Sequence, residues 1–97
     1  MHLIDVTNSY RRMVENQLSG TDAQYIKVYS LGSNTVIYSE SRRQINVVIS
    51  NKARKIKDIE QDFVIDNFFK DYDKEDLQVD VTDKRRVIDI STANKQS

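Results

Sequence analysis

Apolar residues stand at every second position in several short stretches of this chain, and this spacing restricts its fold more than any other feature. The stretches 45–49 and 77–81 are the clearest examples, interrupted only by Val48. Because successive side chains of a strand point to opposite sides of a sheet, the spacing predicts half-buried strands. Stretches rich in β-branched and aromatic residues extend the prediction. We expect strands at residues 3–6, 24–31, 35–39, 45–49, 77–82 and 88–90.

Two other stretches have the spacing of amphipathic helices. The first begins near residue 8, after side chains that can cap a helix, and ends at Gly20. The second is predicted over 59–71, where Asp58 and Gln61 have the spacing of a capping box. The apolar face of each helix predicts that it packs on the sheet. These faces consist of Tyr10, Met13, Val14 and Leu18 in the first helix, and of Val64, Ile65, Phe68, Phe69 and Tyr72 in the second.

The elements follow one another in the order β-α-β-β-β-α-β-β, which is typical of the α+β class. We predict a two-layer fold in which both helices pack on a mixed or antiparallel sheet. The 97 residues include 27 Ile, Val, Leu and Phe, enough for one core, and no proline or Gly/Ser-rich linker marks an internal boundary. A single domain is expected over 1–90, followed by a frayed tail over 91–97, where Ala93 is the only apolar residue.

The composition excludes several functional classes. Without cysteine the chain has no disulfide or zinc–cysteine chemistry, and a lone His2 excludes histidine triads and multi-histidine metal sites. The longest aliphatic run, 47–49, is far shorter than the roughly 20 residues of a membrane-spanning helix. Residues 1–5 lack the pattern of a secretory signal. We therefore expect a cytoplasmic protein that is not attached to a membrane, is not an enzyme, and has no catalytic residues, cofactor or metal.

Four cations lie within six residues just before the second predicted helix. Helix N-termini attract anions, so a basic loop at this place predicts a site for a phosphate group or a nucleic-acid backbone. Two further basic clusters, 42–43 and 84–86, lie at other chain reversals and could share one surface with it. The alternative is that each cluster is a solvated turn, which the net charge of zero favours. The candidate anion- or nucleic-acid-binding residues are Arg42, Arg43, Lys52, Arg54, Lys55 and Lys57.

Three tyrosines form a second candidate surface. Tyr25, Tyr29 and Tyr38 lie on two adjacent predicted strands, where Tyr25 and Tyr29 share a face, and they could stack on bases or contact a protein partner. The alternative is a set of half-buried cross-strand aromatic pairs. The carboxylates of residues 58, 62 and 66 recur every four positions on the second helix, a spacing that a solvated helix face explains more simply than a Mg²⁺ site.

Five short segments in the first two-thirds of the chain carry a family resemblance through their order. They are Asp5-Val6-Thr7-Asn8-Ser9-Tyr10, Thr21-Asp22-Ala23, Val28-Tyr29-Ser30-Leu31-Gly32, Thr35-Val36-Ile37-Tyr38 and Ile56-Lys57-Asp58. Together they resemble a family of short proteins from lactic acid bacteria and streptococci known as domain of unknown function 1827. The resemblance implies a bacterial cytoplasmic α/β protein, and it brings no activity, cofactor or catalytic residue with it.

The small size, the many short strands and the neutral charge favour one function over the others. We predict a small non-enzymatic cytoplasmic module that self-associates or docks on a protein partner through an exposed sheet edge. If the chain self-associates, the simplest homo-oligomer is a dimer. The alternative is nucleic-acid or phosphate-ligand binding through the basic loop before the second helix.

Overall fold

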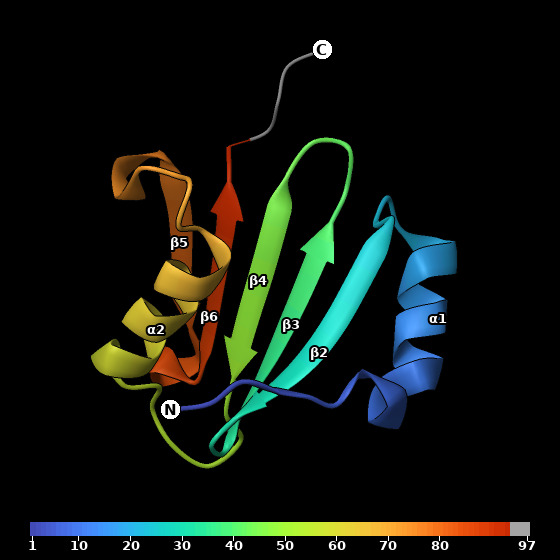
Figure 1. Cartoon of the computed structure of the whole chain (residues 1–97). Helices are drawn as coiled ribbons and strands as arrows, with labels where there is room; N and C mark the ends of the chain where they lie inside the picture. Colours follow the sequence, from blue (N-terminus) through green and yellow to red (C-terminus); the bar gives the residue numbers. More distant parts are fainter. Residues whose placement is uncertain (94–97) are drawn as a thin grey trace.

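The computed structural model describes residues 1–93, which form one six-stranded sheet and two α-helices (Figure 1). The order of the elements confirms the predicted α+β fold. Among these residues, neither α1 nor α2 is long and apolar enough to cross a membrane. The 3-10 turns Thr7–Tyr10, Lys74–Asp76 and Asp83–Arg85 lie before α1 and on either side of β5. The other elements are β1 (Ile4–Asp5), α1 (Arg11–Gly20), β2 (Tyr25–Leu31), β3 (Asn34–Glu40), β4 (Ile45–Ser50), α2 (Asp58–Phe68), β5 (Leu77–Thr82) and β6 (Val87–Thr92).

The strands lie side by side in the order β1-β2-β3-β4-β6-β5, and every neighbouring pair is antiparallel. β2, β3 and β4 form an antiparallel meander, and β5 and β6 form a closing hairpin. The two edge strands differ in length, because β1 has two residues and β5 has six. Within the described chain, β5 therefore presents the longer free edge, and such an edge carries unpaired backbone N–H and C=O groups.

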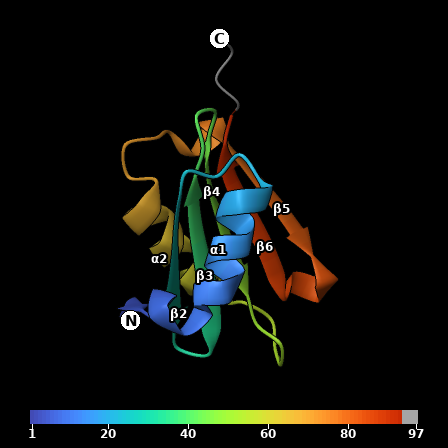
Figure 2. The ribbon, with the colours of Figure 1, turned by 90° about the vertical axis from the view of Figure 1, so that its right-hand side faces the viewer.

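The two helices cover opposite faces of the sheet (Figures 1 and 2). The strand register places Val28 and Ile37 on one face and Val36 and Ile49 on the other. Val14 of α1 packs with the first pair, whereas α2 packs with the second. The predicted two-layer arrangement is wrong in this respect, because β2 and β3 carry apolar side chains on both faces. As a result α1 covers one side of the sheet and α2 covers the other.

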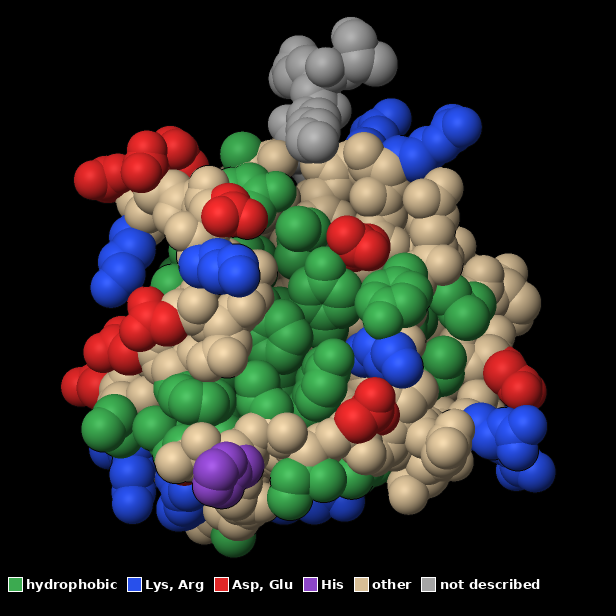
Figure 3. All heavy atoms as spheres, viewed as in Figure 1, with side chains coloured by type: hydrophobic (Ala, Val, Ile, Leu, Met, Phe, Trp, Pro, Cys, Tyr) green, Lys and Arg blue, Asp and Glu red, His purple; other side chains and the backbone are tan. Residues whose placement is uncertain are grey.

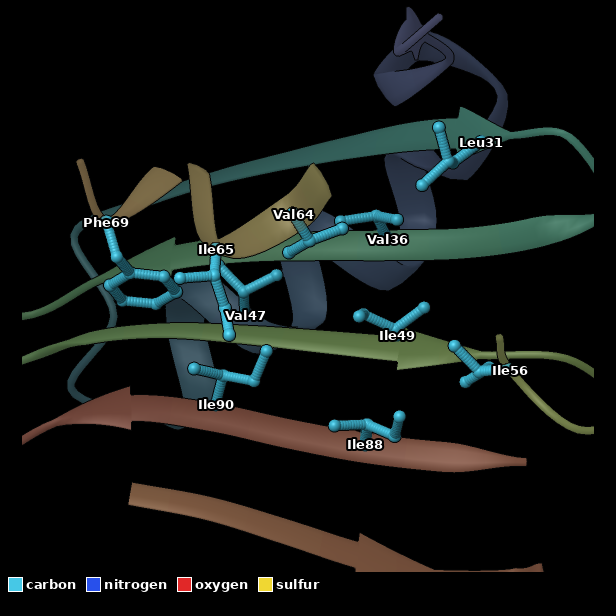
Figure 4. Close-up of a cluster of buried hydrophobic side chains, with 10 residues drawn as sticks. All are labelled: Leu31, Val36, Val47, Ile49, Ile56, Val64, Ile65, Phe69, Ile88 and Ile90. Atoms are coloured by element: carbon cyan, nitrogen blue, oxygen red, sulfur yellow. The ribbon is translucent and has the colours of Figure 1, made fainter. Parts of the chain in front are cut away.

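The main core lies between α2 and the centre of the sheet (Figure 4). In this view the side chains of β4 and β6 point toward those of α2. Each fully buried aliphatic or aromatic side chain contributes roughly 1.5–3 kcal/mol, so this layer fixes α2 and the loop that precedes it. Its buried members are Leu31, Val36, Val47, Ile49, Ile56, Val64, Ile65, Phe69, Ile88 and Ile90.

The second helix begins and ends earlier than predicted. It stops at Phe68 instead of residue 71, so Tyr72 lies outside the helix and is 38% exposed. Its cap is Lys57 and not Asp58, because the carboxylate of Glu60 accepts a hydrogen bond from Lys57 N at 2.8 Å. The capping carboxylate thus comes from the third residue of the helix.

The first helix also ends differently. Gly20, the predicted end of the helix, does not have the left-handed backbone that is common in a glycine that ends a helix. Thr21 ends the helix, since its N–H and its hydroxyl both donate to the carbonyl of Gln17, at 3.0 and 2.7 Å. Of the predicted apolar face, Val14 is buried whereas Leu18 is 40% exposed.

The last strand extends beyond the predicted domain end at residue 90. β6 includes Ser91 and Thr92, which the prediction assigned to the frayed tail. Thr92 is buried, and its Oγ1 accepts a hydrogen bond from Ile45 N at 3.0 Å. The domain therefore includes these two residues, while 94–97 lie outside the described residues.

Candidate protein-interaction surface

Strand β5 is exposed along nearly its whole length. Five of its six residues, from Gln78 to Thr82, are exposed. Leu77, Val79 and Val81 share the sheet face on which α2 packs, yet Val79 and Val81 are 39% and 44% exposed, because no strand or helix of the described chain lies beyond β5. Sequence reasoning did not name these valines as site residues. Their position in the first strand of the closing hairpin could have indicated an edge strand, because the adjacent sequence provides only one strand, β6, to pair with it.

β5 connects two parts of the molecule that carry opposite charge. The acidic segment, residues 70–76, contains four carboxylates and two lysines, whereas the basic turn, residues 83–86, contains three cations and one carboxylate. Figure 3 shows acidic side chains gathered at the upper left, where the acidic segment lies, and basic side chains along the lower edge. The strand therefore runs from a negative to a positive end.

The basic turn has an unusual backbone. Asp83, Lys84 and Arg85 have φ angles of 50, 53 and 66°, in the left-handed region that costs an L-residue roughly 1–2 kcal/mol. Contacts with the loop before α2 and with the first residue of α2 hold the turn in place. Ile56 N donates to Arg85 O at 2.9 Å, and Arg85 Nη2 donates to Asp58 Oδ1 at 2.9 Å. These contacts thus hold the strained backbone of the turn in place.

The loop 51–57 is held by buried polar side chains. Asn51 is 5% exposed, and its Oδ1 accepts hydrogen bonds from the N–H groups of Ala53 and Arg54 at 2.9 and 3.0 Å. Its Nδ2 donates to Asn34 Oδ1 at 2.8 Å. Its backbone N–H donates to the carbonyl of Arg86, which ties the loop to the basic turn. Loop and turn thus form one supported unit.

Glu60 completes this support. It is 7% exposed and accepts hydrogen bonds from both Arg54 Nη atoms, at 2.9 and 2.8 Å, and from Lys57 N. The two bonds from Arg54 do most to lower the pKa of Glu60 to about 2, against the opposing effect of burial. Asn34 Nδ2 is buried with no hydrogen-bond partner among the described residues, yet it lies near enough to Glu60 to lower its pKa further. Both Nη atoms of Arg54 are therefore engaged in hydrogen bonds within the fold.

The other predicted cations of this loop remain exposed. Lys52, Lys55 and Lys57 form no ion pair within residues 1–93, and neither does Lys84 of the basic turn. Lys55 and Lys84 border a shallow hollow of about 490 Å³. We call these four lysines the basic end. Two of the three basic clusters therefore meet, as the sequence allowed.

The third cluster lies elsewhere. Arg42 and Arg43 precede β4, whereas the loop 51–57 follows it, so the two clusters occupy opposite ends of that strand (Figure 1). Arg43 borders a different hollow, a groove of about 540 Å³ between α1 and the sheet. The six candidate anion-binding residues thus do not form one surface.

Comparisons with known proteins agree with this architecture. A family model described as a domain of unknown function (DUF1827) matches residues 1–93. The chain belongs to this family. The crystal structure of a conserved protein of unknown function from Streptococcus thermophilus LMG 18311 is 32% identical to the chain, covers 99% of both chains and has a TM-score of 0.87. No curated protein matches.

The three tyrosines of this DUF1827 protein lie on the face where α2 packs, and they contact one another and the helix. The ring of Tyr38 stacks on Phe68 at 5.3 Å between centroids, Tyr29 lies 5.5 Å from the same ring, and Tyr25 meets Tyr38 edge-on at 6.1 Å. Burial raises the pKa of Tyr38 to about 12, with a smaller contribution from Glu40. These contacts are those of half-buried aromatic pairs, and Tyr25, 45% exposed, is the outermost member.

The acidic face of α2 is divided between the fold and solvent. Asp58 pairs with Arg85, whereas Asp62 and Asp66 are exposed. Within the described part of this DUF1827 chain, no group of three His, Cys, Asp or Glu side chains is placed to hold a metal ion.

Proposed function

We propose that this DUF1827 protein is a non-enzymatic cytoplasmic interaction module that binds a protein strand along β5. The observation that carries the proposal is a six-residue edge strand with two exposed valines on one face. An added strand satisfies the free backbone groups of such an edge, and alternate side chains of the edge supply the specificity. Val79 and Val81 then form the apolar contact, with Leu77 beside them.

The experiment compares a tagged full chain with a variant whose edge is blocked. The variant carries Val79→Lys and Val81→Lys, and the matched control carries Ile59→Lys on the exposed side of α2, where Ile59 is 64% exposed. Each bait is expressed in its native host together with an untagged copy of the chain. We expect the wild type and the control to retain a stoichiometric protein, either the untagged copy or another chain, which the blocked variant loses. A protein set that is the same for all three baits would overturn the proposal.

A second candidate function is binding of a phosphate-bearing ligand at the basic end. The observation that favours it is the meeting of loop 51–57 with the basic turn, which gathers four lysines without ion pairs in the described chain. Phosphate contacts of this kind weaken steeply with salt. A labelled single-stranded oligonucleotide and inorganic phosphate serve as separate probes. Lys55→Glu should weaken binding, and Arg42→Glu, at the far end of β4, should not; equal effects would refute this site.

A further inference from the structure

The charges at the two ends of β5 favour one orientation of an added strand. The acidic segment precedes the strand and the basic turn follows it. A second β5 that lies antiparallel places its own basic turn beside the first acidic segment, and its acidic segment beside the first basic turn. A parallel second strand would place like charges together. Opposite charges across a contact favour the matched orientation and disfavour the other.

The side chains of β5 also restrict the register of such a pairing. In an antiparallel pair of identical strands related by a twofold axis, directly opposite side chains lie on the same face of the sheet. The axis must therefore pass between one residue and the same residue of the other copy, and we call this residue the centre of the pair. A centre at Asp80 would put two carboxylates opposite each other, and a centre at Gln78 would put Asp80 opposite Asp76. A centre at Val79 avoids both repulsions. It sets Val79 against itself, Leu77 against Val81, and Gln78 against Asp80.

We infer that the strand bound at β5 is β5 of a second copy of this chain, paired antiparallel about a twofold axis at Val79. The inference rests on the proposed function and names its partner. The pairing joins two sheets into one continuous antiparallel sheet, brings the two Val79 side chains together and sets each Val81 against Leu77 of the other copy. The opposite edge strand, β1, has two residues and offers no comparable contact.

A single introduced cysteine tests both the partner and the register, because the chain has no cysteine of its own. Val79 and its copy lie opposite each other, where cross-strand Cβ atoms are about 4.5–5.5 Å apart, close to disulfide geometry. Val81 has nearly the same exposure and lies on the same face, yet in this register it is roughly 14 Å along the strands from its copy. Val81→Cys is therefore the matched control for Val79→Cys.

Under mild oxidation, we expect Val79→Cys to form a covalent dimer at least about tenfold faster than Val81→Cys, because a defined contact gives an effective concentration in the millimolar range. Equal rates, or no dimer from either variant while both remain folded by circular dichroism, would overturn the inference. Sedimentation equilibrium of the purified wild type should show a monomer–dimer equilibrium. A monomer at every concentration would also overturn it, whereas a native-host partner lost with the blocked edge would leave the proposed function standing.

Charge reversal tests the orientation separately. Asp76→Lys and Lys84→Glu should each weaken dimer formation roughly tenfold, since each change acts twice in a symmetric dimer. In this register Asp76 lies opposite Thr82 of the other copy, and Lys84 is its diagonal neighbour, within reach of a long side chain. The two changes in one chain therefore restore opposite charges at both contacts and should recover most of the affinity. Additive weakening in the double variant would contradict antiparallel pairing.

Discussion

Replacement of Glu60 by glutamine tests whether the buried contact with Arg54 stabilises the loop before α2. The Glu60 carboxylate is 7% exposed and accepts three hydrogen bonds of 2.8 to 2.9 Å, two from Arg54 and one from Lys57 N. They lower its pKa from 4.5 to about 2. A shift of this size corresponds to roughly 3 kcal/mol of stability at neutral pH. The Arg54 side chain is 36% exposed and partly screened, so we expect Glu60→Gln to lose about 2 kcal/mol.

The pH dependence of that loss identifies its cause. Because the pKa of Glu60 is lower in the folded than in the unfolded protein, the stabilisation is complete above pH 4.5 and is lost as the pH falls toward 2. Urea unfolding followed by circular dichroism should give a wild-type advantage of about 2 kcal/mol near pH 7 that shrinks markedly near about pH 3. Asp62→Asn, an exposed carboxyl on the same helix, is the control and should change stability by less than about 0.5 kcal/mol. A loss of equal size at both pH values would refute the reasoning.

Three further predictions concern single side chains. Thr92→Val removes the acceptor of Ile45 N and should cost roughly 1–3 kcal/mol in urea unfolding, whereas an unchanged midpoint would contradict the contact. Lys84→Gly relieves a left-handed φ of 53° and should stabilise the folded protein by roughly 0.5–1 kcal/mol in thermal unfolding. The control Lys74→Gly, at a position without positive φ, should destabilise the protein, and a change of the same sign in both variants would argue against backbone strain at Lys84. In ultraviolet titration the highest phenol transition, near pH 12, should disappear in Tyr38→Phe, and its survival would assign the raised pKa to another tyrosine.

The strands could be predicted because alternation is a local property. Residues 45–49 and 77–81 carry the pattern in their own sequence, and both stretches form strands. Short connections then fix which strands are neighbours, since consecutive strands joined by tight turns usually pair. The layering could not be predicted in the same way. β2 and β3 bury apolar side chains on both faces, and which helix covers which face depends on contacts between distant segments.

In the candidate anion site, one feature could be predicted from the sequence and another could not. Sequence spacing grouped Arg54 with the lysines around it, but its partner Glu60 is six positions away, and the loop must fold back to bring the two together. The separation of Arg43 from Lys52, however, follows from the length of the strand between them. A six-residue strand spans roughly 20 Å, so cations before and after β4 lie at opposite ends. Since β6 runs antiparallel to β4, the turn at 83–86 must lie near Lys52.

Asp80 is a charged residue in the middle of the edge strand that we propose to pair with a second copy. A charged residue on an edge strand commonly discourages pairing with another chain. Here the same carboxylate faces Asp89 across the β5–β6 pair, so this side of the sheet already carries two negative charges. A register that adds a third carboxylate is disfavoured, whereas the neutral amide of Gln78 can donate to Asp80. In the dimer that we propose, this charge selects among registers, and the opposite charges at the two ends of β5 select the direction of the added strand. The net charge of zero does not reveal either effect of the proposal, because the sum ignores where along β5 the individual charges lie.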